Sequence, residues 1–308
     1  MDMSFVKEIL PSNSRNKGRF AALGGGLLLS FDSVFIRLSG AGGFDTAFLF
    51  GMFSAISMAL VIQVTSKKGL VQTLLEGGWP IVFSALLIVG SASTFVLSIK
   101  HTSVANTVLI MSARPVFTAL ASWLFLKEKS SKLLLLAIVG VMCGIFIVVN
   151  GSLGGGSLLG DGLAVVTVIC LGLNGSLWRR YKAMSRFAVV GLGGFFIALV
   201  MFIPATPSNY STQTWLIMGC MGVASAPLGR VLNAISSRFI PVAEMATLTL
   251  ISAVLAPLWA FIFFSERPPV ATLIGGAVIL LSILSYIYLS GRKTVVQPVT
   301  ATLRSGDI

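Results

Sequence analysis

Ten runs of about 20 mostly apolar residues divide the sequence, and they constrain the fold more than any other feature. A transmembrane helix needs about 20 such residues to cross the hydrocarbon core of a bilayer. The runs are continuous and do not alternate, which excludes the strands of a membrane barrel. We therefore predict an all-α integral membrane protein with ten transmembrane helices, approximately over residues 20–38, 44–64, 79–99, 103–125, 132–150, 160–180, 187–205, 214–236, 241–264 and 268–290.

The composition supports a lipid environment. The chain is 56% hydrophobic and only 10% charged, whereas soluble globular proteins carry about a quarter charged residues. So few charges cannot cover a water-facing surface, and the lipid bilayer is the expected partner. The net charge of +12 comes from basic residues in the short gaps between runs, not from a basic face or groove, so we expect no nucleic-acid partner.

The basic residues also predict the orientation of the chain. With the N-terminus inside, seventeen lysines and arginines fall on the inner side and three, Arg37, Lys100 and Arg267, on the outer side. We therefore predict a multi-pass protein of the inner or plasma membrane with both termini cytoplasmic. The first run contains Asp32 and lacks an A-x-A cleavage site, so we interpret it as a retained span and not as a signal peptide.

An internal repeat divides the chain into halves. The segment that begins at Val104 aligns without gaps on the segment that begins at Val242, with a constant offset of 138 residues, and Glu128 then meets Glu266. Each half holds five runs, and an odd number of spans places the halves in opposite orientation. The predicted organisation is an N-terminal tail (1–19), two inverted five-helix repeats (20–150 and 160–290) and a C-terminal tail (291–308).

One segment resembles the drug/metabolite transporter superfamily, specifically its EamA-like branch. It reads Arg114-Pro115-Val116, then Leu126-Lys127-Glu128, then Gly140 and Gly144, and is similar to a "P-V … L-G-E" pattern of that branch. Lys127 replaces the usual glycine, and Ala253 aligns with Pro115 in the second half. The resemblance implies a transporter that exports amino acids, other metabolites or occasionally drugs, in some members coupled to protons.

Arg114 is the foremost candidate for solute binding. It lies near the middle of the fourth run, where an ionisable group costs a few kcal/mol or more and is therefore a functional candidate. Pro115 follows it and is expected to bend the helix and free backbone carbonyls, which gives Pro115 a gating role. The guanidinium could bind a substrate carboxylate, and the alternative is a structural ion pair with Asp32.

Asp32, in the first run, could bind substrate, carry a coupling proton or pair with Arg114. Glu244 and Arg230 could form an inner gate that opens during transport, while snorkelling to the interface is the alternative for Arg230. Pro257 lies one helical turn beyond the position that aligns with Pro115 and is the matching gating candidate in the second half.

The polar residues Asn106 and Asn174 and the deeply placed Trp259 are further candidates for lining the route. Small polar residues also hydrogen-bond between membrane helices for packing alone. Gly140 and Gly144 form a G-x-x-x-G pattern that is better explained by close helix packing or a homodimer seam than by chemistry.

These features favour a secondary-active transporter, an exporter of a small amphipathic metabolite such as an amino acid, that works by alternating access. A facilitative channel or a multidrug exporter is the alternative, and a membrane-embedded transferase is less favoured because the acidic residues are scattered. The chain is therefore not expected to be an enzyme. No nucleotide-binding motif occurs, and His101 is the only histidine, so we expect no cofactor and no metal site.

Overall fold

The computed structural model describes residues 14–66, 69–126, 132–151, 158–181, 184–236, 239–240 and 248–294. Within these ranges the regular elements are all helices, which confirms the predicted all-α class. They are α2 (Ser14–Ser30), α3 (Asp32–Leu38), α4 (Gly43–Thr65), α5 (Gly69–His101), α6 (Val104–Ser112), α7 (Arg114–Leu126), α8 (Lys132–Gly151), α9 (Leu158–Arg180), α10 (Arg186–Met201), the 3₁₀ turn η1 (Pro207–Asn209), α11 (Thr212–Cys220), the π-helix η2 (Met221–Ser225), α12 (Ala226–Ser236), α14 (Ile251–Phe264) and α15 (Val270–Thr294).

Each predicted run contains helical residues, but the helices differ in length. Among the described residues, seven helical segments are long and apolar enough to cross a membrane, and there are eight if the bent pair of α6 and α7 counts as one span. The runs 187–205 and 241–264 hold the shorter apolar helices α10, with 16 residues, and α14, with 14 residues. The number of ten transmembrane helices therefore stays a prediction.

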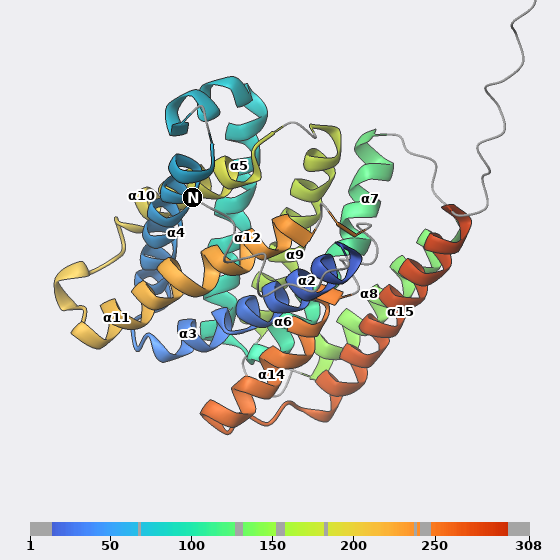
Figure 1. The fold of residues 1–308 in the computed structure, drawn as a ribbon. Coiled ribbons are helices and arrows are strands. Elements are labelled where there is room, and N and C mark those ends of the chain that lie inside the picture. Colours follow the sequence, from blue (N-terminus) through green and yellow to red (C-terminus); the bar gives the residue numbers. More distant parts are fainter. Residues whose placement is uncertain are drawn as a thin grey trace, which may run out of the picture.

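The main helix contacts join the two halves of the chain. The helix α4 packs against α10, α8 against α15, α5 against α9, and α2 against α12. Figure 1 shows α8 and α15 side by side at one edge of the bundle, with α4 and α10 towards the opposite edge. Each of these pairs takes one helix from before residue 152 and one from after residue 157, so the core lies between the halves.

Glycines allow the closest of these contacts. A Cβ atom on Gly51 of α4 would lie 2.7 Å from the carbonyl oxygen of Gly194 on α10. A Cβ atom on Gly144 of α8 would lie 2.8 Å from the carbonyl oxygen of Gly275 on α15. Backbones can approach this closely only where small residues face each other, so the packing interpretation of Gly144 is confirmed.

Several helices are interrupted along their length. The helix α5 contains Gly78, whose φ of 57° suits glycine, and Pro80 follows it. Phe31 separates α2 from α3, and Ala113 separates α6 from α7, which are bent by 40°. Pro115 stands in the first turn of α7, which confirms that the chain bends at this proline. Interrupted helices at membrane depth free backbone groups, and they are tolerated where protein or a water-filled cavity surrounds them.

We predict that Gly144→Ala destabilises the fold by about 1–3 kcal/mol, the usual cost of overpacking a close contact. The added methyl group would meet the Gly275 carbonyl oxygen and, at 2.6 Å, the side chain of Ile279. Thermal unfolding of the purified protein in detergent measures the effect. The matched control is Gly162→Ala on α9, where the new Cβ has nothing within 4 Å. An equal midpoint for the two variants would contradict the prediction.

Candidate functional site

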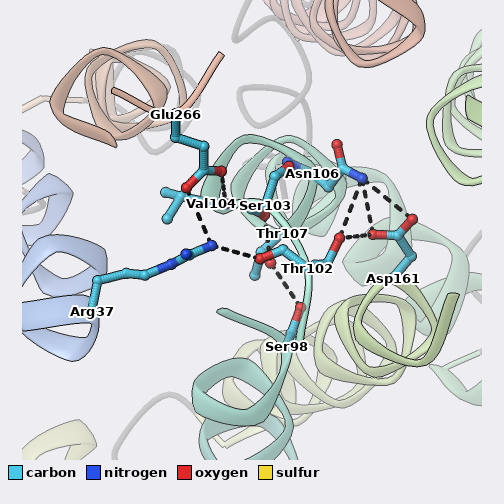
Figure 2. Close-up of polar contacts among 9 residues, drawn as sticks. All are labelled: Arg37, Ser98, Thr102, Ser103, Val104, Asn106, Thr107, Asp161 and Glu266. Carbon is cyan, nitrogen blue, oxygen red and sulfur yellow. Dashed lines mark hydrogen bonds and ion pairs between the residues drawn. The ribbon is translucent and has the colours of Figure 1, made fainter. Parts of the chain in front are cut away.

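An ion pair joins two helical segments at one end of the bundle. The Nη2 atom of Arg37, at the end of α3, lies 3.2 Å from Oε2 of Glu266, in the turn before α15. The other carboxylate oxygen of Glu266 accepts the backbone N–H of Val104 at 2.8 Å, and Arg37 donates to the backbone oxygen of Thr102 at 2.8 Å (Figure 2). The Glu266 carboxylate thus caps the first turn of α6, and it ties the two halves together.

A second, fully buried network lies beside this ion pair. Asp161, in the first turn of α9, is completely buried and accepts the Thr102 hydroxyl at 2.7 Å and the Asn106 amide at 3.0 Å (Figure 2). The amide oxygen of Asn106 accepts the hydroxyl of Thr272 at 2.6 Å. The predicted substrate residue Asn106 therefore connects α6, α9 and α15 beside the Arg37–Glu266 ion pair.

Asp32 lies at the break between α2 and α3. The side chain is 8% exposed, and among the described residues its buried Oδ1 atom has no hydrogen-bond partner. Its charge interacts with that of Arg230 on α12, although no N–O contact within 4.0 Å joins the two side chains. Asp32 therefore faces an opposite charge that it does not touch.

Arg230 also has an unmet bonding capacity. Its buried Nη1 atom has no hydrogen-bond partner within the described part of the chain, and its Cζ atom lies 5.9 Å from the centre of the Phe50 ring. One turn further along α12, no described residue bonds to the buried Oδ1 atom of Asn233. An unsatisfied buried polar group costs about 1–3 kcal/mol, and more when it is charged, so such groups need an explanation.

Trp259 of α14 completes the surroundings of the helix break. Its indole Nε1 donates to the Ser30 hydroxyl at 2.9 Å, and its ring stacks on Phe31 with the centroids 4.7 Å apart. The fold thus brings the predicted residues Asp32, Arg230 and Trp259 to the same break, from helices that are far apart in the sequence.

Arg114 lies elsewhere and does not pair with Asp32. Its Cζ atom is 5.9 Å from the centre of the Trp178 ring on α9, and its charge interacts with that of Arg186 at the start of α10. The predicted residue Asn174 hydrogen-bonds to the Ser84 hydroxyl, which also accepts the indole N–H of Trp178 at 2.9 Å. Arg114 and Asn174 therefore share the surroundings of one tryptophan.

The two remaining gating candidates are less informative. Glu244 lies outside the described residues, so its predicted pairing with Arg230 stays a prediction. Pro257 lies inside α14, two residues before Trp259.

Two surface hollows lie near the helix ends, and neither is lined by Asp32 or Arg114. One, of about 360 Å³, contains Asp45, Thr206 and Tyr210; the other, of about 610 Å³, contains Arg180 and Ser185. In the first, Asp45 accepts the Tyr210 hydroxyl at 2.9 Å and the Thr206 N–H at 2.7 Å. Burial and this hydrogen bond raise the pKa of Tyr210, which keeps it a donor, so the contact is a structural connection between α4 and the loop before α11.

Sequence reasoning missed four contributors. Arg37 was considered only as an outer-side charge, and Glu266 only as the position in the repeat that aligns with Glu128. Asp161 opens a predicted run, and its burial depends on packing against α6. Arg186 was counted only as an inner-side charge. The sequence signal for these four residues is a charged residue at the edge of an apolar run. The partner of each residue is visible only in the fold.

Comparison with known proteins agrees with this architecture. One similar solved structure, described only as a crystal structure of a protein, is 17% identical, with a TM-score of 0.63 over 90% of this chain and 99% of its own. At that identity the likeness shows a shared fold. No curated protein sequence matches the chain significantly.

The model of the EamA-like transporter family matches the sequence twice, over residues 16–150 and 158–288. The two matches correspond to the two halves that pair α4 with α10 and α8 with α15. They cover most of the chain as two repeats, and with the apolar helices they indicate a multi-pass membrane protein. The chain belongs to the EamA-like transporter family.

Proposed function

We propose that the protein is a secondary-active carrier that exports a small zwitterionic metabolite such as an amino acid. The observation that carries this proposal concerns two buried atoms on helices of the two repeats, Oδ1 of Asp32 and Nη1 of Arg230. Their side chains are opposite in charge, and neither atom has a hydrogen-bond partner among the residues that the structure describes. A zwitterion offers an ammonium group to the Asp32 carboxylate and a carboxylate to the Arg230 guanidinium. The rings of Phe31 and Trp259 add an apolar wall for the side chain of the solute.

The energetics favour a ligand over a structural ion pair. Burying two charges without direct contact is costly, and a bound ion of each sign would supply the missing hydrogen bonds. Charge-assisted hydrogen bonds contribute about 1.5–3 kcal/mol each, which is enough to select a zwitterion over a neutral analogue.

The proposed cycle uses inversion of the two repeats. The double family match and the pairing of helices across the halves support this arrangement. The interruption at Ala113 has a counterpart at Leu250, which precedes α14, one residue from the position that the 138-residue offset predicts. Two inverted halves that rock around a central site would expose that site to each side in turn.

In this cycle the Arg37–Glu266 pair closes the side that the basic residues place outside. It joins α3 and the start of α6 to the turn before α15, so separating the halves there must break it. The structure would then represent the state closed on that side.

Counterflow in proteoliposomes loaded with mixed labelled amino acids tests the solute site. We expect saturable accumulation in the wild type and a fall of about tenfold or more in Asp32→Asn and Arg230→Gln, because each loses a charge-assisted contact. The matched control is Asp45→Asn, a carboxylate held by Thr206 and Tyr210 away from the site.

Unchanged accumulation in both site variants would contradict the assignment. No accumulation of any amino acid by folded wild type would remove this substrate class and direct the search to nucleosides, sugars and drugs. A flux that rises linearly with concentration would favour a facilitative channel.

Glu266→Gln should open the closed side more often. Gln keeps an acceptor for Val104 but loses the ion pair, and a partly exposed pair is worth up to about 1 kcal/mol, or roughly fivefold in population. The test uses a background in which the three native cysteines are replaced and Ser33→Cys introduces a single thiol. With Glu266→Gln added to this background, a membrane-impermeant maleimide should react with the thiol from that side up to about fivefold faster than without it. The control is Glu76→Gln, whose carboxylate contacts Gln72 within α5. Equal rates in Glu266→Gln and Glu76→Gln would show that the pair is not a closure.

A further inference from the structure

Two arginines lie against one tryptophan at a place that the solute site does not use. The Cζ atoms of Arg114 on α7 and Arg186 on α10 are 5.9 and 5.3 Å from the centre of the Trp178 ring. The two guanidinium groups are close enough to interact with each other. None of these three residues contributes to the cluster of Asp32, Arg230 and Trp259.

The two arginines have no counter-charge in the part of the chain that the structure describes. Among the residues that the structure describes, neither arginine forms an ion pair with a carboxylate. Two like charges repel each other, and the interaction with the ring offsets only about 0.5–2 kcal/mol for each. An anion bound between them would convert the repulsion into two charge-assisted contacts.

The surroundings are ordered and can be reached. The Trp178 ring is fixed because its indole N–H donates to the Ser84 hydroxyl, which is fully buried and also bonds Asn174. Arg114 is half-buried, whereas Arg186 is exposed, so an anion can enter from the Arg186 side.

The backbone adds to the positive potential. Arg186 is the first residue of α10, a helix of 16 residues that is capped by the Ser185 hydroxyl. The N-terminus of a helix favours negative charge by typically about 0.3–1 kcal/mol. The start of α10 therefore acts in the same direction as the two guanidinium groups.

We propose that Arg114, Arg186 and Trp178 form an anion-binding site for a phosphate or carboxylate group, separate from the solute site. Planar guanidinium groups match the oxygen atoms of these anions bidentately. The anion is either a free one or the headgroup of an anionic lipid at the membrane surface, and both present the same oxygen chemistry. This site does not depend on the identity of the transported solute.

The test measures thermal unfolding of the purified full chain in detergent, at constant ionic strength, while inorganic phosphate is titrated. Anionic phosphatidylglycerol in mixed micelles is the second probe, compared with phosphatidylcholine alone. We expect one of the two anions to raise the unfolding temperature of the wild type by a few degrees. In Arg114→Gln and Arg186→Gln the apparent affinity should fall about tenfold or more.

A second readout separates binding from a structural role. In anion-free buffer Arg186→Gln should unfold at the same temperature as the wild type or higher, because one of two repelling charges is gone. A structural arginine would lower the unfolding temperature under both conditions. The matched control is Arg180→Gln, an exposed arginine whose Cζ atom lies 5.8 Å from the Tyr181 ring.

Each outcome decides the proposal. A response to phosphate identifies a free anion, and a response to phosphatidylglycerol alone identifies a lipid headgroup. No response of the wild type to either probe overturns the site. So does a response that Arg180→Gln reduces as much as Arg114→Gln does, because that pattern describes a general basic surface.

Discussion

Close contact between glycines of opposite halves is the interaction on which the rest of the bundle depends. Lipid is as apolar as leucine, so burying side chains gives membrane helices little reason to associate, and dense backbone packing must hold them together. Gly51 with Gly194 and Gly144 with Gly275 provide that packing in two helix pairs. The helices that carry breaks and charges lie beside these pairs, and their polar groups are held at fixed places because the pairs are rigid.

Three groups of charged residues differ in their electrostatics within this frame. The Arg37–Glu266 pair is neutral and supported by backbone hydrogen bonds. Asp32 and Arg230 are opposite in sign but separated, and Arg114 and Arg186 are alike in sign. The last two arrangements cost free energy because no described residue neutralises these charges by direct contact.

Much of the architecture could be predicted because lipid restricts what a span can be. Length and polarity located the helices, and the constant offset between the halves anticipated the two family matches. Asp32, Arg114 and Arg230 could be singled out because a charge within an apolar run is expensive. Their partners could not be found in the same way. Arg114 was weighed as a partner of Asp32, and the structure instead places Arg230 near Asp32 and Arg186 near Arg114. Pairing depends on how helices rotate and tilt against each other, and a single sequence does not encode that in its periodicity.

The π-helix η2 between α11 and α12 has a consequence for the register of this span. A π turn accommodates one residue more than an α-helix needs, and such turns are frequent at functional sites. Since successive residues of an α-helix are about 100° apart, removing one residue from Met221–Ser225 would turn all of α12 by about that angle relative to α11. Arg230 would then leave its place near Asp32 while every residue of the site remained in the sequence. The inserted residue therefore sets the rotation of α12 relative to α11. The length of this span, as much as its composition, determines which side chains reach the interior.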